Sequence, residues 1–322
     1  MPQRDALPSP PSRAARALSL ALALALAPAA AARADQAPVP DAGPMPDTTP
    51  FACSQCEAWN ADVAPFALHG DTDYVGVAGL SSVVLRTPAG LVLVDGGLPQ
   101  SAPRIAAHLA ARGLDVRDVR WILVSHPHFD HAGGVAALQR MSGATVVAPA
   151  AGLQAMRAGG VLPHDPQAGY APHNGYPPVI GPTLALADGA VLDAGGVPIT
   201  ITHTDGHAPG GATWHWPSCD AGGCTTLVYA DSLTAVSSEG YRFSEHPERL
   251  AALEQAFARI EALDCDLLVA AHPGFGRLFE REAARSDGER SSLREPGACR
   301  AYAAGGRAWL AERMAEEAAA AP

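Results

Sequence analysis

The chain has 322 residues, of which 48% are hydrophobic and 17% charged, a composition typical of a globular protein with one large core or two domains. It contains no lysine, so a Walker-type phosphate loop, a pyridoxal Schiff base and a serine nucleophile activated by lysine are all excluded. The formal net charge is −11, and because phosphate binding needs a basic surface, we expect no nucleic-acid partner.

The first 34 residues have the pattern of a secretory signal peptide. Arginines precede an apolar run at residues 18–27, and Ala32-Arg33-Ala34 fits the small-x-small rule for signal cleavage. We expect the mature chain to begin near Asp35, with 18 basic and 32 acidic residues and a net charge of −14. The apolar run is too short to span a bilayer as a permanent helix, which favours release into the periplasm, with no membrane partner, over a retained signal anchor.

Residues 35–52 are rich in proline and alanine, and we expect a flexible arm there. No linker divides residues 53–322, so we expect a single domain. Its first elements should be short strands separated by glycine and proline turns, followed by a helix at residues 101–112 that ends at Gly113. The expected strands are residues 74–80, 82–87 and 91–95.

The central motif follows an apolar strand at residues 121–125. It reads His126-Pro127-His128-Phe129-Asp130-His131, four side chains able to bind a metal, before a helix that begins near Gly133. Imidazole nitrogen and carboxylate oxygen are ligands that Zn²⁺ accepts. Two histidines spaced by one residue can turn toward one ion while Asp130 and His131 face elsewhere, so the spacing predicts two metals roughly 3.5–4 Å apart. The alternatives are a histidine-rich loop without metal and a single structural ion, although a closed structural site favours cysteine ligands.

The second half of the chain repeats this order of a strand followed by polar residues. A strand at residues 197–202 leads to His207, one at residues 225–230 leads to Asp231, and one at residues 266–271 leads to His272. Two similar halves of strands and helices predict an αββα sandwich, with two mixed sheets face to face and helices outside. The pattern does not predict which strands pair. Further helices are expected at residues 133–141, 149–158, 247–263 and 298–320, with a strand at 145–148.

Residues 159–182 break the periodicity with many prolines and glycines. A long irregular loop inside a domain is often an element that covers the substrate, and otherwise a plain surface excursion.

The six cysteines suggest disulfides in an exported chain. Cys219 and Cys224 flank a turn that would join two strands, and Cys265 with Cys299 would link the last strand to the C-terminal helix. Cys53 and Cys56 are then the remaining pair. Their C-x-x-C spacing is also that of a redox pair or half a zinc ribbon, but no second pair completes a ribbon and no thioredoxin-like βαβ surrounds it.

The order H-x-H-x-D-H, then G-H about 75 residues further on, then A-H-P-G, resembles subclass B3 of the metallo-β-lactamase superfamily over nearly all of residues 53–322. The resemblance extends to Asp231-Ser232, where this subclass has serine in place of a metal-binding cysteine, and to the placement of Cys265 and Cys299. It implies two Zn²⁺ per chain, with ligands divided into two sets. The first ion would bind His126, His128 and His207, and the second Asp130, His131 and His272.

The resemblance also implies a reaction. A metal-bridging hydroxide would hydrolyse the β-lactam amide bond of penicillins, cephalosporins and carbapenems, which gives antibiotic resistance, and Asp130 would orient this hydroxide. We expect a monomer that acts on this small-molecule substrate. Ser232, Thr234 and Gln167 are candidate substrate contacts, and the alternative for Ser232 and Thr234 is ordinary hydroxyls at a strand end.

Asp231 leaves a second reading open. Other hydrolases of this fold, such as glyoxalase II, use an aspartate in a similar context to bridge both metals. If Asp231 does so, the substrate is a lactone or thioester; if it only supports a ligand, the lactamase reading holds. A third hypothesis is a zinc-binding protein without turnover, which the complete ligand set argues against.

Overall fold

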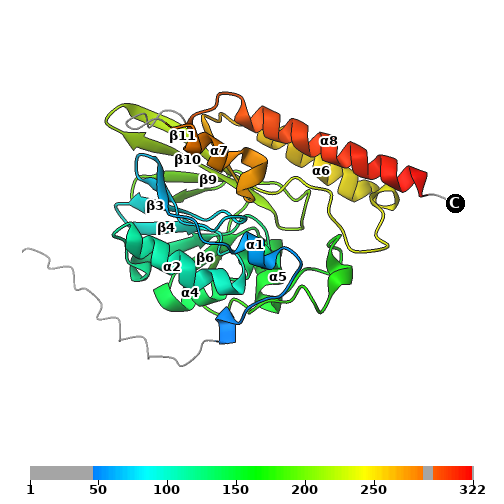
Figure 1. Ribbon diagram of the computed structural model, residues 1–322, viewed down its shortest axis with the longest axis horizontal. Coiled ribbons are helices and arrows are strands. Elements are labelled where there is room, and N and C mark those ends of the chain that lie inside the picture. Colours follow the sequence, from blue (N-terminus) through cyan, green and yellow to red (C-terminus); the bar gives the residue numbers. More distant parts are fainter. Residues whose placement is uncertain (1–45, 286–292, 321–322) are drawn as a thin grey trace, which may run out of the picture. The chain divides into compact units, whose positions relative to one another are not determined.

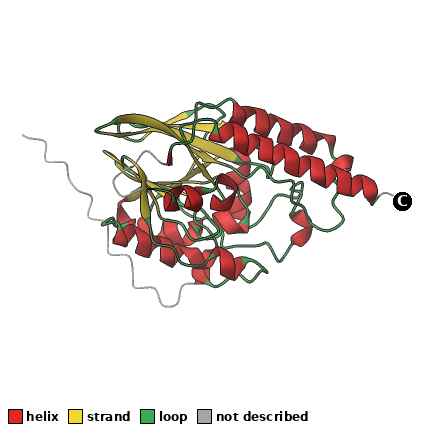
Figure 2. Ribbon diagram, turned by 45° about the horizontal axis from the view of Figure 1, so that its top comes forward, coloured by secondary structure: helices red, strands yellow, loops and turns green. Residues whose placement is uncertain are grey.

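The computed structural model describes residues 46–285 and 293–320 of the chain. The predicted signal peptide, residues 1–34, and the first part of the predicted arm, residues 35–45, lie outside the described residues. Two β-sheets face each other, and helices cover the outer face of each sheet (Figures 1 and 2). The predicted αββα sandwich is therefore confirmed.

The larger sheet contains, among the described residues, seven strands in sequential order. Strands β1 to β4 pair antiparallel, whereas β4, β5, β6 and β7 pair parallel. Parallel strands bring their carboxyl ends to one edge of a sheet, which is where α/β proteins build their sites. The strands are β1 Phe66–His69, β2 Thr72–Tyr74, β3 Val83–Thr87, β4 Gly90–Val94, β5 Val119–Leu123, β6 Thr145–Ala148 and β7 Thr183–Ala185.

The smaller sheet has the order β12-β11-β10-β9-β8 within the described part of the chain. Its pairings are antiparallel except that of β11 with β12. The strands are β8 Val191–Asp193, β9 Pro198–His203, β10 Ala212–Asp220, β11 Gly223–Ala230 and β12 Leu267–Ala270.

The helices form two outer layers. In Figure 1, α2 and α4 lie on the side of the larger sheet, while α6 and α8 run side by side over the smaller one. The α-helices are α1 Cys56–Trp59, α2 Ala102–Ala111, α3 Phe129–Ala132, α4 Val135–Ser142, α5 Ala150–Ala158, α6 Pro247–Glu261, α7 Leu278–Ala283 and α8 Ala298–Ala319.

Alternating side chains explain why both faces of each sheet are apolar. In β3, Val83 and Leu85 enter the core between the sheets, whereas Val84 packs against the helices outside. In β11, Tyr229 faces the other sheet, whereas Val228 faces α6 and α8. Because successive side chains of a strand point to opposite faces, strands covered on both sides are apolar at nearly every position.

The expected strand at residues 74–80 is wrong. Strand β2 ends at Tyr74, and the chain then turns back on itself, with the Val77 amide donating to the Leu80 carbonyl. The Tyr74 hydroxyl donates to the Val77 carbonyl inside this turn. A side chain at Gly76 would lie 2.4 Å from the Ser82 amide nitrogen, so the turn is too tight for one. The short edge strands β1, β7 and β8 were also not predicted.

The predicted flexible arm needs a correction at its C-terminal end. Residues 46–52 contact the domain: Asp47 forms an ion pair with Arg140, and the Phe51 ring stacks on Phe129 at 4.3 Å between centroids. The Phe51 amide also donates to the side chain of Gln100. Specific partners, which composition does not reveal, hold this proline-rich segment in place.

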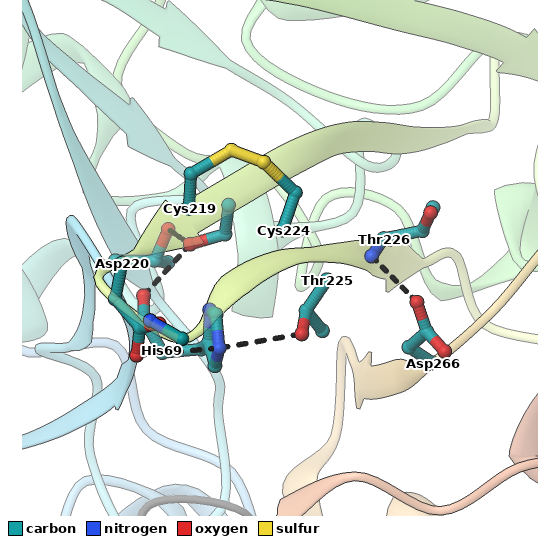
Figure 3. The surroundings of a disulfide bond; sticks show 10 residues. His69, Cys219, Asp220, Cys224, Thr225, Thr226 and Asp266 are labelled. Carbon is teal, nitrogen blue, oxygen red and sulfur yellow. Dashed lines mark hydrogen bonds and ion pairs between the residues drawn. A yellow bond between two sulfur atoms is a disulfide. The ribbon is translucent and has the colours of Figure 1, made fainter.

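Three disulfides join the cysteines in the expected pairs, Cys53 to Cys56, Cys219 to Cys224 and Cys265 to Cys299. Figure 3 shows the second of these, which links β10 to β11 across their turn. There His69, from β1 of the other sheet, lies 3.3 Å from the Thr225 hydroxyl and 3.5 Å from the Asp220 carboxylate. The hairpin of the smaller sheet therefore contacts the edge of the larger one.

Among the described residues, no helix combines the length and the apolar character needed to cross a bilayer.

Candidate metal centre

The predicted ligands come together at the carboxyl ends of three strands. Residues 126–131 follow β5, His207 follows β9, and His272 follows β12. The single turn of α3 carries Asp130 and His131, and His128 occupies its N-cap position. The two sheets thus contribute ligands to one rim, as the sequence analysis expected.

His126, His128 and His207 form a first triad. The Nε2 atom of His207 lies 3.1 Å from the Nδ1 atom of His128, and the three ligand atoms lie within 4.8 Å of one another. All three side chains are buried. Each ring also makes a contact on its other side, and these contacts fix its orientation.

In each ring, the nitrogen that faces away from the other two histidines lies beside a buried oxygen atom. The Nε2 atom of His128 lies 3.0 Å from the Asp165 carboxylate, and the Nδ1 atom of His207 lies 2.7 Å from the Thr234 carbonyl. On His126, Nδ1 lies 2.9 Å from the Asp231 carboxylate. Hydrogen-bonded partners of this kind select the ring nitrogen that faces a metal.

Asp130, His131 and His272 form a second triad. The Nε2 atoms of the two histidines are 3.2 Å apart, and the Asp130 carboxylate lies 3.4 Å from His131 Nε2 and 3.3 Å from His272 Nε2. His131 Nδ1 lies 3.4 Å from the Asp95 carboxylate, and His272 Nδ1 lies 3.0 Å from the Gly79 carbonyl. Asp130 and His131 are also within 4.8 Å of His126, so the two triads are adjacent.

Burial and neighbouring charges set the protonation of the two triads. Burial lowers the pKa of His126 well below its ordinary range, and burial with the His128 imidazole lowers the pKa of His207 to about 3. Burial alone would raise the pKa of Asp130, but His131 and His272 hold it well below the ordinary value. Burial alone would lower the pKa of His131, but the Asp130 carboxylate raises it to about 10. In the first triad, His126 and His207 are thus held in the neutral form, and in the second the Asp130 anion lies beside a protonated His131.

The facing nitrogens of the first triad fit a metal ion. His207 donates its Nδ1 proton to a carbonyl, and His128 directs Nε2 to a carboxylate, so in the neutral rings both facing nitrogens carry lone pairs. Two lone pairs 3.1 Å apart repel each other unless a cation, either a proton or a metal ion, lies between them. Neutral imidazole is also the form that binds Zn²⁺.

A family model described as the Metallo-beta-lactamase superfamily matches residues 75–272, which include both triads. The chain belongs to this superfamily. The resemblance that the sequence motif indicated is therefore confirmed.

Solved structures of the superfamily match the chain over most of its length. The Rm3 metallo-beta-lactamase is 46% identical, with a TM-score of 0.79, over 83% of this chain and 99% of that one. MEM-A1, a subclass B3 metallo-beta-lactamase isolated from a soil metagenome library, is 42% identical, with a TM-score of 0.78, over 81% of this chain and 99% of that one. MIM-1 from Novosphingobium pentaromativorans is 38% identical, with a TM-score of 0.75, over 82% and 94%.

The curated proteins that match part of the chain are named hydroxyacylglutathione hydrolases, not β-lactamases. A hydroxyacylglutathione hydrolase of Anaeromyxobacter dehalogenans is 30% identical over 182 residues, 56% of this chain and 55% of that protein. One from Ruegeria pomeroyi is 28% identical over 202 residues, 63% of this chain and 64% of that protein. The match spans between half and two thirds of the length of these relatives.

The three predicted substrate contacts, Gln167, Thr234 and Ser232, lie at different positions relative to the two triads. Gln167 lines the cavity next to the triads, and its side-chain nitrogen is 3.4 Å from His128 Nδ1. Thr234 also lines the cavity, but its hydroxyl lies 3.2 Å from His207 Nδ1, so it also supports that ligand. Ser232 is 1% exposed, is not among the cavity-lining residues, and its hydroxyl has no hydrogen-bond partner in the described residues.

Both carboxylate oxygens of Asp231 already contact other groups of the protein. One carboxylate oxygen lies beside His126 Nδ1 and accepts the Ser232 amide at 2.8 Å, and the other accepts the Thr204 hydroxyl at 2.9 Å. The geometry therefore agrees with the reading in which Asp231 supports a ligand rather than bridging two metals.

The side chains that orient the predicted ligands, Asp165 and Asp95, were not predicted. Each nevertheless has a recognisable signal in the sequence. Asp95 ends an apolar strand, and Asp165 precedes a proline in the irregular loop. Asp95 has a φ of 59°, unusual for a non-glycine residue, and accepts hydrogen bonds from Ser125 and Tyr229.

A cavity of about 610 Å³ opens beside both triads. Its walls come from the segment that begins at Phe51, from the irregular loop after α5, and from residues next to His272. The loop at residues 159–182 therefore contributes a wall of the cavity, through Gln167, Tyr170, His173 and Asn174.

Proposed function

We propose that this protein is a periplasmic β-lactamase that hydrolyses the amide bond of penicillins, cephalosporins and carbapenems with two zinc ions. The observation that carries the proposal is the combination of the two triads with similarity to B3 metallo-beta-lactamases along nearly the whole of their chains. The contacts of Asp231 support the same choice, since both of its carboxylate oxygens already have partners.

The proposed ligands divide as the sequence motif suggests. His126, His128 and His207 would hold one zinc ion, and Asp130, His131 and His272 the other. Bound zinc lowers the pKa of water toward neutrality and stabilises negative charge that develops on a carbonyl oxygen.

The chain's own groups contribute binding and orientation. Asp165 and Thr234 fix the rings of His128 and His207, so two ligands of the first triad are held before substrate arrives. Asp130 accepts a hydrogen bond from the attacking water and orients it, because a carboxylate beside a cation is a weak base. The Gln167 amide extends into the cavity beside His128 and can donate to an oxygen of the substrate.

The test is turnover by the purified mature chain. We expect hydrolysis of a chromogenic cephalosporin and of a carbapenem in the presence of zinc, loss of activity with a chelator, and recovery when zinc is restored. A metal assay on the active protein should give two zinc ions per chain. Absence of turnover by zinc-loaded, folded protein would contradict the proposal.

A second candidate, thioester hydrolysis, is favoured by the curated relatives, which are named hydroxyacylglutathione hydrolases. A hydroxyacylglutathione thioester should therefore be assayed beside the two β-lactams. Turnover of the thioester without turnover of either β-lactam would favour this alternative.

The periplasmic location has its own test, because residues 1–34 lie outside the described residues. The exported protein should have a mature N-terminus near Asp35. An intact N-terminus on membrane-bound protein would favour the retained anchor.

A further inference from the structure

Exposed aromatic side chains gather at the mouth of the metal cavity. Tyr170, Phe275 and Trp309 are 41%, 45% and 42% exposed, and all three line that cavity. Among the described residues these are the aromatic members of the exposed large hydrophobic side chains. Apolar surface that stays exposed at a cavity marks a place where a ligand is bound.

Phe275 and Trp309 form a pair that separates two cavities. Their rings meet edge to face, 5.9 Å between centroids, and the Phe275 ring is 5.6 Å from that of His272. On the far side of the pair lies a second cavity of about 270 Å³. Both cavities share three lining residues, Thr234, Phe275 and Trp309, so the second one adjoins the metal cavity across these side chains.

The second cavity is open because Gly305, in the middle of α8, has no side chain. Glycine is among the poorest helix formers, yet α8 has two in succession, Gly305 and Gly306. Packing explains Gly306, since a Cβ there would lie 2.8 Å from the Phe257 ring and 2.9 Å from Leu233. It does not explain Gly305, where a Cβ would have no heavy atom within 4 Å. Gly305 lines the second cavity and leaves it open.

The walls of the second cavity are mainly apolar, with Leu233, Tyr302 and the aromatic pair among them. An apolar cavity of about 150 Å³ is enough to bind benzene, so this one can hold a single substituted ring. An aromatic ring in this cavity, beside Phe275 and Trp309, would gain edge-to-face contacts as well as burial.

We propose that this second cavity is a specificity subsite that binds an aromatic substituent of the substrate, on the side remote from the bond that is cleaved. The proposal rests on the proposed β-lactamase function for the identity of the substrate. Its geometry, however, is that of an apolar pocket next to the metal cavity, with aromatic side chains at the boundary between them. Phe275 and Trp309 would act as determinants of specificity, and Gly305 as the residue that keeps the pocket open.

The experiment fills the pocket. Gly305→Leu places a side chain into the second cavity without steric conflict at Cβ, and Ala311→Leu adds the same side chain at an exposed position of α8 that lines neither cavity. Gly305→Ala serves as a smaller intermediate. Circular dichroism should show that all three variants keep the fold.

Two penicillins with the same nucleus provide the readout, one with a phenylacetyl amide and one with an acetyl amide. We expect Gly305→Leu to reduce kcat/KM for the phenylacetyl substrate about tenfold, mainly through KM, and that for the acetyl substrate by less than about twofold. Ala311→Leu should change neither value. An equal loss for both substrates, or no loss for the phenylacetyl substrate, would overturn the proposal.

Direct binding separates this proposal from the proposed function. N-phenylacetylglycine, which contains no β-lactam, should bind the wild-type protein and Ala311→Leu in ligand-observed NMR, and should bind Gly305→Leu at least about tenfold more weakly. Such binding without β-lactam turnover would retain the subsite and reject the lactamase function. Turnover without this difference in binding would retain the function and reject the subsite.

Discussion

The two triads are built differently although they lie side by side. The first consists of imidazoles, whose outer nitrogens contact buried oxygens of Asp165, Asp231 and Thr234. The second includes the Asp130 carboxylate, and its His272 side chain is 19% exposed. Polarity and exposure thus increase from the first triad to the second. We infer that the first is a buried set of imidazole ligands and the second a more open set, with a carboxylate among its ligands, on the substrate side.

The largest expected effect comes from removing a ligand of the first triad. His128→Ala should reduce kcat/KM by at least about a thousandfold, because a zinc ion contributes several kcal/mol of charge stabilisation. His272→Ala, at the partly exposed ligand of the second triad, should have a smaller effect, about a hundredfold. Both variants should keep the wild-type circular dichroism spectrum. Undiminished activity of His128→Ala would show that the ligand assignment is wrong, and equal losses would remove the distinction between the triads.

The next effect concerns the partner of a ligand rather than the ligand. Asp165→Asn removes the charge that faces His128 Nε2, so we expect zinc affinity to fall about 10–100-fold. Competition with a chelating dye would measure it. Asp188→Asn is the matched control, because Asp188 forms its ion pair with Arg259 at the surface. No change in Asp165→Asn relative to that control would mean that the loop does not support the first triad.

A third prediction tests how α8 supports the loop that follows Thr234. Glu317 accepts the amides of Phe243 and Ser244 and contacts Arg313, which also donates to the Ser237 hydroxyl. Burial alone would raise the pKa of Glu317, but the Ser244 amide and Arg313 lower it to about 2, from an ordinary value of 4.5. The folded pKa is therefore the lower one, so the carboxylate stabilises the fold above pH 4.5, and this stabilisation is lost as the pH falls toward 2.

Glu317→Gln should accordingly reduce the free energy of unfolding by about 1–2 kcal/mol at neutral pH and by progressively less in acid. Urea unfolding of metal-free protein at neutral and acidic pH would measure this difference. Glu316→Gln, at an exposed neighbouring position, is the control. A difference between Glu317→Gln and wild type that stays constant with pH would contradict the assignment.

The smallest effect is expected at the wall near the second triad. Phe51, Cys53 and Gln55 line the metal cavity, and the Cys53–Cys56 disulfide constrains this segment. Replacing both cysteines with serine should raise KM about threefold, because the segment must then be ordered when substrate binds. Steady-state kinetics should show kcat unchanged.

The matched control for this wall is the disulfide at the β10–β11 turn in Figure 3. Replacing Cys219 and Cys224 with serine should leave KM unchanged, since neither residue lines the cavity. Equal changes in the two double variants would indicate a general loss of stability instead of a local role.

Local patterns in the sequence were enough to predict the grouping of the ligands and the layers of the fold. Spacing within a few residues was enough to group His126, His128, Asp130 and His131, and the apolar strands before His207 and His272 predicted that all of these side chains would meet at one rim. The layers of the sandwich were also predictable, because a strand covered on both faces and an amphipathic helix each have a characteristic period.

The hydrogen-bond partners of the predicted ligands could be identified only from the tertiary structure. Which nitrogen of His128 faces His207 depends on Asp165, which is 37 residues away, and the orientation of His131 depends on Asp95, from a neighbouring strand. The pairing of strands, the turn after Tyr74 and the contact of Thr234 with His207 are likewise long-range or sterically determined. The physical reason is that periodicity reports which face of an element is apolar, whereas a hydrogen bond between distant segments depends on how those elements pack.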